Sequence, residues 1–291
     1  MKVSGFTIVR NAIKYDYPVV ESIRSILPLC DEVVVAVGNS NDGTRELVAS
    51  IDPNRIRIID TVWDESLREG GAVLAAETNK ALAAVSRNAD WAFYIQADEV
   101  VHEAYLQQIR QGMEQWKEVP AVEGLLFNYK HFWGSYDWVG DSRKWYRREV
   151  RIIRPIRGIN SFKDAQGFRM GERKIRVKSL DAWIYHYGWV KPPSAQQAKQ
   201  QEFHKFWHNE KWINENVSPS QEFDYSIINK LSRFTGEHPA VIQNRMARQN
   251  WKFEPKSDVK PMSHRHQLLD RIEKISGWRI GEYRNYKEIS D

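Results

Sequence analysis

Cysteine and long apolar runs are both scarce in this sequence. Cys30 is the single cysteine among 291 residues, which excludes an internal disulfide framework and a cysteine-rich zinc site. Apolar stretches such as residues 33–37 fall far short of the roughly 18 residues that span a bilayer, and residues 1–3 do not lead into the apolar region of a signal peptide. We therefore expect a cytoplasmic protein in a reducing compartment.

Several familiar binding motifs are also missing. Residues 38–44 have the glycine spacing of a P-loop, but Thr44 stands where that motif requires a lysine. No G-x-G-x-x-G follows the first predicted strand, which argues against a dinucleotide-binding protein and against hydride transfer. His204 and His208 lie four residues apart on a predicted helix, but the glutamate of a zinc protease does not follow His204. We expect these two histidines to be packed or exposed.

Apolar and basic residues are plentiful. Hydrophobic residues make up 42% of the chain, enough for a sizeable core. Residues 1–100 hold 10 basic and 15 acidic side chains, whereas residues 143–178 hold 13 Lys or Arg against three acids. This basic stretch suits an acidic partner, such as a nucleotide diphosphate, a phosphorylated acceptor, nucleic acid or an anionic membrane face. A solvated strand face is the alternative explanation.

Hydrophobic periodicity alternates between strands and helices in the first 116 residues. Short β-branched runs predict strands, and apolar residues at helical spacing predict the helices between them. The predicted strands are residues 3–9, 32–37, 55–59 and 89–95, and the predicted helices are 15–29, 44–51, 70–87 and 102–116. This pattern is typical of a parallel sheet covered on both faces, where ligands bind at the carboxyl ends of the strands.

The pattern changes after Pro120. Extended runs without intervening helices predict a mixed-sheet half, and a polar helical region follows from residue 192 onward. The extended runs are residues 122–133, 145–154, 174–178 and 182–187, and the later helices are 194–209, 239–251 and 264–278.

Asp98 follows the fourth predicted strand directly, in the region where a ligand is expected. Mg²⁺ and Mn²⁺ prefer carboxylate oxygen and often bridge one protein carboxylate to substrate phosphates. The alternative is that Asp98 and Glu99 cap the helix predicted to begin near residue 102, because acidic residues are favoured at helix starts.

The order of these elements resembles a known family. The chain presents in order a strand, a helix, a strand followed by N-D-G-T at residues 41–44, a helix led by glycines and a strand ending in A-D-E at residues 97–99. This order is similar to that of the family-2 glycosyltransferases of GT-A fold. The resemblance covers about residues 3–190. It implies a GT-A-like α/β fold, with a Rossmann-type, mixed and mostly parallel sheet flanked by helices. It further implies a catalytic domain at residues 1–190, with a nucleotide-sugar half at 1–116 and an acceptor half at 117–190, and a helical extension at 191–291.

The resemblance also assigns residues to a nucleotide-diphosphate sugar and a divalent cation, Mn²⁺ or Mg²⁺. The family's S-x-D-G-T turn is matched at residues 40–44, and its metal-binding D-x-D corresponds to Gln96-Ala97-Asp98, where the first Asp is replaced. The implied metal ligands are Asp98 and His186. The implied donor-binding residues are Arg10, Asn39, Asp42, Arg68, Gln96 and Asp98.

Asp164 is the implied catalytic base. It lies in the basic stretch, and the positive surroundings would hold it ionised. A simple ion pair with Lys163 or Arg169 is the alternative role, and Asp137 and Asp141 are the alternative bases.

Aromatic residues in the second half suit a carbohydrate acceptor, because flat sugar faces stack on aromatic rings. Core packing explains them equally well. The expected acceptor-binding residues are Trp133, Tyr136, Asp137, Arg169 and Trp189.

The resemblance thus implies an inverting glycosyltransferase acting on a carbohydrate or lipid-linked acceptor, in cell-surface polysaccharide or glycolipid synthesis. Nucleic acid is not an expected partner. The helix predicted at residues 264–278, with Leu268 and Ile275 among basic residues, could dock at the inner face of the membrane or pack on the domain. The alternatives are a non-catalytic sugar-binding or scaffold protein and a sugar-nucleotide nucleotidyltransferase.

Overall fold

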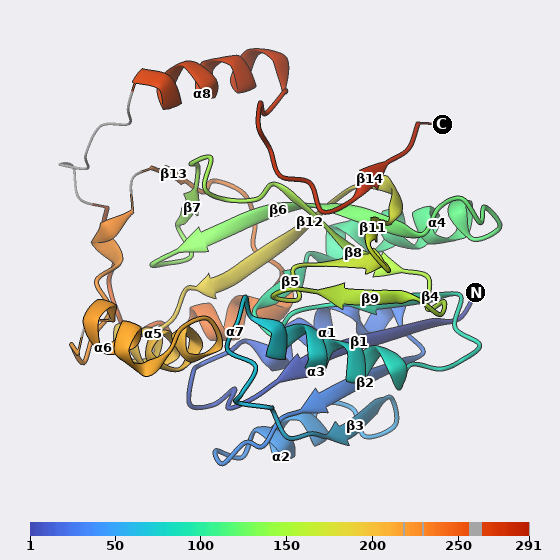
Figure 1. The fold of residues 1–291 in the computed structure, drawn as a ribbon, viewed down its shortest axis with the longest axis horizontal. Coiled ribbons are helices and arrows are strands. Elements are labelled where there is room, and N and C mark those ends of the chain that lie inside the picture. Colours follow the sequence, from blue (N-terminus) through green and yellow to red (C-terminus); the bar gives the residue numbers. More distant parts are fainter. Residues whose placement is uncertain (218, 229, 256–263, 291) are drawn as a thin grey trace.

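Four parallel strands form the N-terminal part of the sheet. The computed structural model describes residues 1–217, 219–228, 230–255 and 264–290. In it, β1 (Val3–Val9), β2 (Glu32–Val37), β3 (Ile56–Asp60) and β4 (Trp91–Tyr94) lie in the order β3-β2-β1-β4 (Figure 1). The strand order therefore reverses between β1 and β4.

Both faces of β1, β2 and β4 are buried because their side chains alternate between two cores, whereas the edge strand β3 is only partly buried. Val33 and Val35 of β2 pack in the core beneath α1 (Val19–Ile26), α2 (Thr44–Ala49) and α4 (Leu106–Trp116). Val34 and Ala36 pack in the other core, beneath α3 (Ala72–Ala83). A strand buried on both faces reads as a continuous apolar run, which explains why β1 and β2 were predicted with their observed bounds.

The second half adds antiparallel pairs. β8 (Arg148–Ile153) pairs antiparallel with both β4 and β6 (Gly124–Trp133), and β12 (Arg176–Trp189) runs parallel to β6. The predicted runs 174–178 and 182–187 belong to this one long strand, whose register shifts between Ser179 and Trp183. The short β5 (Glu99–Val101) pairs with β12 and was not predicted. The α/β fold class expected from the sequence is confirmed.

A small separate sheet lies against α3. It consists of β9 (Ile159–Phe162), β10 (Gly167–Met170) and β11 (Arg173–Lys174), and it was not predicted. Residues 163–166 form the turn between β9 and β10. This turn carries Asp164, so the small sheet is what positions the expected base.

The described residues after 190 form short helices, the longer α8 and the strands β13 and β14. The predicted helix 194–209 corresponds to α5 (Pro193–Phe203) and η3 (His204–Phe206), and the predicted helix 239–251 is reduced to η5 (Ala240–Ile242) and α7 (Gln243–Met246). The division at residue 190 stays a prediction, although β14 pairs with β12 and β13 pairs with β7. The remaining elements are β7 (Trp138–Gly140), η1 (Leu27–Leu29), η2 (Glu103–Tyr105), α6 (Glu210–Asn216), η4 (Tyr225–Ile227), β13 (Leu231–Arg233), α8 (His264–Ser276) and β14 (Lys287–Glu288).

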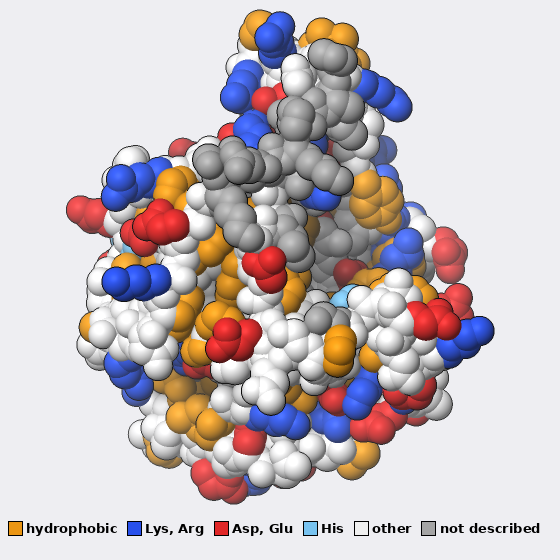
Figure 2. All heavy atoms as spheres, turned by 90° about the vertical axis from the view of Figure 1, so that its left-hand side faces the viewer, with side chains coloured by type: hydrophobic (Ala, Val, Ile, Leu, Met, Phe, Trp, Pro, Cys, Tyr) orange, Lys and Arg blue, Asp and Glu red, His pale blue; other side chains and the backbone are white. Residues whose placement is uncertain are grey.

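Helix α8 projects from the body of the molecule (Figures 1 and 2). Leu268 is 59% exposed and Ile275 is 88% exposed, so this part of its apolar face does not pack on the domain. Among the helices that the structure describes, none combines the length and the apolar character of a membrane span. The peripheral membrane contact of this helix stays a prediction.

Arg151 of β8 is a fully buried charge. Its guanidinium donates to both carboxylate oxygens of Glu99, at 2.8 Å from Nε and 2.7 Å from Nη2, and neither side chain is exposed. Its charged carbon lies 5.2 Å from the ring centre of Tyr94 and 5.3 Å from that of Tyr129. Because the bidentate geometry pairs both oxygens of the carboxylate, the pair offsets the desolvation of its two charges.

We expect Arg151→Met to lower the free energy of unfolding by about 3–5 kcal/mol, because it leaves the Glu99 carboxylate buried without its counter-charge. Urea denaturation would measure the change. The control is Arg45→Met, which removes the exposed pair between Arg45 and Asp60 and should have little effect. A loss for Arg151→Met as small as that of the control would contradict the structural role of the buried pair.

Candidate active site

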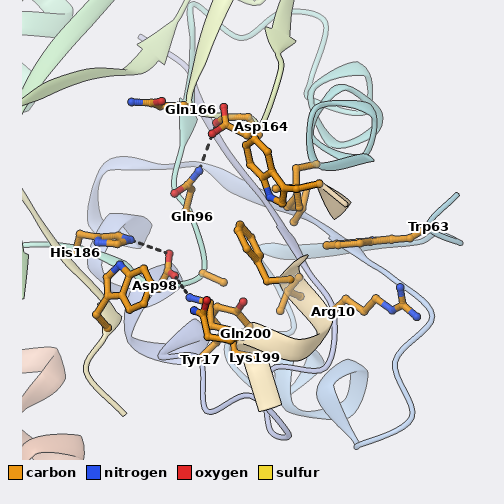
Figure 3. A pocket seen from close by; sticks show the side chains of 18 of the residues that line it. Arg10, Tyr17, Trp63, Gln96, Asp98, Asp164, Gln166, His186, Lys199 and Gln200 are labelled. Carbon is orange, nitrogen blue, oxygen red and sulfur yellow. Dashed lines mark hydrogen bonds and ion pairs between the residues drawn. The ribbon is translucent and has the colours of Figure 1, made fainter. Parts of the chain in front are cut away.

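A cavity of about 510 Å³ lies at the carboxyl ends of β1 and β4. The strand order reverses between these two strands, which is where ligands bind in open α/β sheets. Figure 3 shows Asp98, His186 and Lys199 at one side of this cavity, Arg10 and Trp63 at another, and Asp164 with Gln96 at a third. The side chains of Tyr17, Leu74, Tyr94, Tyr146, Trp189, Phe203 and Trp207 supply most of its apolar wall.

Asp98 lies at the end of β4, where the sequence predicted a ligand-binding carboxylate. It is 8% exposed, and its Oδ2 accepts a hydrogen bond from the Lys199 ammonium at 3.2 Å. Burial alone would raise the pKa of this carboxyl, but the charge of Lys199 contributes most to outweighing it, and the pKa of Asp98 lies well below its usual range. Asp98 is therefore ionised in the cavity wall.

The protonation of His186 follows from its neighbour His131. His131 Nε2 lies 2.8 Å from the carbonyl oxygen of Tyr146, which can only accept, so this nitrogen carries the proton. His186 Nδ1, 3.2 Å from His131 Nδ1, must then donate to it. Burial lowers the pKa of both rings, so both are neutral near pH 7. His186 Nε2 therefore directs a lone pair towards Asp98 Oδ1, 3.7 Å away.

Gly188 leaves space beside these two groups. A Cβ at this position would lie 2.7 Å from Asp98 Oδ2 and 2.7 Å from His186 Nε2. Carboxylate oxygen and neutral imidazole are ligands of Mn²⁺, and Mg²⁺ or Mn²⁺ bound to a nucleotide completes its coordination with water and phosphate. The donor set fits a divalent cation with two protein ligands. The described ranges contain no group of three or more His, Cys, Asp or Glu that could hold a metal by themselves.

Asp164 lies in the turn between β9 and β10 and lines the same cavity. Its neighbours Lys163 and Ala165 have φ of 54° and 60°, a left-handed conformation that costs a non-glycine residue roughly 1–2 kcal/mol. Such strain is typical of functional sites. A Cβ at Gly71, at the start of α3, would lie 2.9 Å from the Cβ of Asp164, so only glycine permits this approach.

The surroundings of Asp164 differ from those that the sequence predicted. Burial raises the pKa of its carboxyl above the usual value, and the charges of Lys163 and Arg151 only partly oppose this. Arg169, one of the cations expected to pair with Asp164, contacts the ring of Phe162 and the hydroxyl of Tyr283 instead.

Hydrogen bonds hold the turn that carries Asp164. Gln96 Nε2 donates to the carbonyl of Ala165 at 3.4 Å, and Arg151 Nη1 donates to that of Gln166 at 2.9 Å. The Gln166 side chain donates to Oε1 of Glu149 at 2.8 Å. Glu149 is 2% exposed, and burial raises its pKa to about 8, so it carries a proton at neutral pH.

Unpaired donors gather near Arg10. Its Nη2 pairs with Glu65 at 3.0 Å, but the buried Nε and Nη1 have no hydrogen-bond partner among the described residues. The same holds for the indole Nε1 of Trp63 on this side, and for that of Trp207, which lines the cavity beside Asp164. Buried donors without acceptors cost free energy, so this side of the cavity suits a ligand rich in acceptor oxygens.

Three predicted donor-binding residues do not line the cavity. Asp42 accepts from the backbone N–H of Lys14 at 2.7 Å and from the hydroxyl of Thr44 at 2.6 Å, which fixes the turn after β2. Asn39 is exposed and its side-chain oxygen accepts from the backbone of Trp63. Arg68 pairs with Glu210 at 2.7 Å. Their binding roles stay predictions.

Of the predicted acceptor-binding residues, Trp189 lines the cavity and Trp133 stacks on it with ring centres 4.7 Å apart. Tyr136 is buried in a separate aromatic cluster with Tyr187. Asp137 is exposed. Arg169 lies on β10 and does not line the cavity, and neither does Asp141, which pairs with Lys230.

The basic stretch 143–178, which the structure describes in full, places no Lys or Arg in the cavity wall. Six of its 13 cations pair instead with acids that are distant in sequence. The pairs are Arg143–Glu273, Arg147–Glu282, Arg148–Glu288, Arg151–Glu99, Arg173–Glu123 and Arg176–Glu123. The stretch therefore does not face a ligand in this cavity, and its contact with another acidic partner stays a prediction.

Sequence reasoning missed the wall formed by α5 and η3. Lys199, Gln200, Phe203 and His204 line the cavity, while His208 stacks on Trp212 with ring centres 3.5 Å apart. Lys199, Phe203 and His204 are spaced so that they share one face of the predicted helix, and this spacing was a local signal that they act together. Nothing in the sequence indicated that this face closes over β1 and β4.

No protein-family model matches the chain, and no curated protein matches it. Among solved structures, it is similar to TarS 1–349 from S. aureus in complex with UDP, at 15% identity and a TM-score of 0.41, covering 69% of this chain and 64% of that chain. This chain thus spans about 64% of the TarS structure's length.

Two further similarities are shorter. Mannosyltransferase PcManGT from Pyrobaculum calidifontis, in complex with GDP-Man and Mn²⁺, is 20% identical with a TM-score of 0.31, over 43% of this chain and 34% of that chain. Glucosyl-3-phosphoglycerate synthase from Mycobacterium tuberculosis, in complex with Mn²⁺, UDP and phosphoglyceric acid, is 17% identical with a TM-score of 0.29, over 45% and 43%. The matches thus include the class of enzyme that the sequence resembles.

We expect Glu149→Gln to remove a pH dependence of stability. The pKa of Glu149 is about 8 in the folded state and about 4.5 in the unfolded chain, so the wild type loses stability as the pH rises between these values, whereas the neutral amide does not. The free energy of unfolding of the variant minus that of the wild type should therefore increase by up to about 1.4 kcal/mol for each pH unit in this window. Urea denaturation at pH 5, 6, 7 and 8 measures it, with the exposed Glu46→Gln as control. A constant difference across these pH values would contradict a protonated Glu149.

Proposed function

We propose that this chain is a glycosyltransferase, which moves a sugar from a nucleotide-diphosphate sugar to an acceptor hydroxyl. The observation that carries the proposal is the composition of the cavity at the strand-order reversal. Cationic groups and unpaired N–H donors lie on two sides of it, and the carboxylate of Asp164 lies on a third. Such a cavity can hold an anionic leaving group opposite a base.

The donor's diphosphate would lie between Arg10 and Lys199. Both side chains line the cavity, and the unpaired Nε and Nη1 of Arg10 are suited to phosphate oxygens. Asp98 and His186 Nε2 are the groups that would hold a divalent cation. When bound, that cation would neutralise charge developing on the departing diphosphate.

Asp164 would act as the base in a single in-line displacement. It takes the proton of the acceptor hydroxyl, and the hydroxyl oxygen bonds to the anomeric carbon. The bond between that carbon and the diphosphate oxygen breaks, the nucleoside diphosphate leaves with the electron pair, and the configuration inverts. Burial, which raises the pKa of Asp164, makes its carboxylate a stronger base than an exposed aspartate.

The acceptor is proposed to be a carbohydrate or a lipid-linked oligosaccharide. Trp189 and Tyr146 offer flat apolar faces in the wall of the cavity that Asp98 and Asp164 also line, which suits a sugar ring. A role in cell-surface polysaccharide or glycolipid synthesis is consistent with the exposed apolar residues Leu268 and Ile275 on α8, which could contact the inner face of a membrane.

We expect Asp164→Asn to lower kcat about a hundredfold or more, because the amide cannot accept the acceptor's proton. The dissociation constant of the donor should barely change, since the base acts on the acceptor. In the wild type, kcat/KM should fall as the pH falls through the raised pKa of Asp164, and steady-state kinetics across pH would locate this limb. Asp137→Asn and Asp141→Asn are controls outside the cavity. If Asp164→Asn keeps near-normal turnover and one of the two controls loses its turnover, the base is the residue changed in that control.

We expect a nucleoside diphosphate to raise the melting temperature. A ligand that binds only the native state at 100 times its Kd adds about 2.7 kcal/mol to the free energy of unfolding. A panel of UDP, GDP, CDP, ADP and dTDP, each with and without Mn²⁺, would identify the base. Asp98→Ala should abolish the additional shift that Mn²⁺ contributes. The absence of any shift across the panel would refute the donor assignment and favour a binding or scaffold role.

A further inference from the structure

Lys199 of α5 places an ammonium group against the carboxylate that would hold the cation. Its Nζ lies 3.2 Å from Asp98 Oδ2 and 3.1 Å from the carbonyl oxygen of Gly188, and its side chain is 11% exposed. Gly188 is also the residue whose missing Cβ leaves space beside Asp98 and His186. The ammonium and a cation would therefore use the same carboxylate and the same space.

The ammonium is oriented for a further partner. It can donate three hydrogen bonds, and the described residues accept two of them, at Asp98 and Gly188. Lys199 also lies over the ring of Tyr17, with Nζ 4.9 Å from the ring centre, and both residues line the cavity. A phosphate oxygen in the cavity is a fitting third acceptor for this ammonium.

The charge balance beside Asp98 also indicates that Lys199 and a cation exclude one another. Asp98 is the carboxylate that Lys199 contacts, and the side chain of Gln96, two residues earlier, is uncharged and donates to Ala165. One carboxylate is neutralised by one ammonium. A divalent cation added beside both would leave two surplus positive charges in a largely buried wall, and like charges at this distance repel.

We propose that Lys199 supplies from within the chain the positive charge that a divalent cation would supply. With no metal present, Lys199 lets the cavity bind a nucleoside diphosphate, and it competes with the cation for Asp98. This inference rests on the proposed glycosyltransferase function for the identity of the anion. The competition for Asp98 does not depend on that function.

Calorimetric titration of the full chain tests the first part, with the nucleoside diphosphate that the thermal panel selects. In EDTA the wild type should bind it, and Lys199→Gln should bind it at least about tenfold more weakly, because a charge-assisted hydrogen bond is lost. Lys199→Arg keeps the charge and should restore most of the affinity. The matched control is Lys205→Gln, which changes an exposed lysine paired with Glu202 in the same segment and should bind as the wild type does.

Titration with Mn²⁺ alone tests the second part. Lys199→Gln should bind Mn²⁺ more tightly than the wild type, by about tenfold, because the competing ammonium is gone. Lys205→Gln should not. The amide of Lys199→Gln can still donate to Asp98 and Gly188, which keeps the wall together, and circular dichroism confirms that each variant is folded.

The possible failures are distinguishable. A wild type that binds the nucleoside diphosphate only with Mn²⁺, or a Lys199→Gln variant that binds it in EDTA as tightly as the wild type, overturns the inference while the proposed function stands. Unchanged or weaker Mn²⁺ binding by Lys199→Gln overturns the competition. Failure of every nucleoside diphosphate to bind the wild type, with and without Mn²⁺, refutes the proposed function and the metal-free binding together, and leaves the Mn²⁺ titration to decide the competition.

Discussion

The buried ion pair between Arg151 and Glu99 joins the two chemically different sides of the cavity. Glu99 is the neighbour of Asp98 in the chain, so the pair fixes the end of β4 where a cation or ammonium meets the carboxylate. The same guanidinium holds the carbonyl of Gln166, two residues beyond Asp164. One buried charge therefore sets the position of both carboxylates, and its rigid fork resists small displacements of either.

The parts of the fold that sequence could predict are those determined by local pattern. β1 and β2 were predicted with their observed bounds because both faces of each strand are apolar, and Asp98 was found because the carboxyl ends of such strands lie at a known place. β5 and the small sheet of β9–β11 were missed, because strands of two to four residues carry too few positions to show a period. Asp164 lines the cavity, its role as base stays a prediction, and the sheet that carries it was not foreseen.

Long-range pairing explains the remaining errors. The excess of basic residues between 143 and 178 suggested an anionic ligand, but acids from the C-terminal end of the chain, such as Glu273, Glu282 and Glu288, neutralise much of it. The cations that do face the cavity are Arg10 and Lys199, which lie outside that stretch and far apart in sequence. Which charges remain available to a ligand is a property of the assembled chain.

The connection between β12 and α5 restricts how the cavity can open. Lys191 is fully buried, its ammonium donates to the carbonyl of Tyr15 at 2.8 Å, and its own carbonyl accepts from the hydroxyl of Tyr225 at 2.9 Å. Two prolines follow directly, and α5 begins at the second of them. A helix anchored at its first turn can move as a rigid rod only by pivoting there. The amplitude of such a swing grows along α5, so Lys199 would shift less than Phe203.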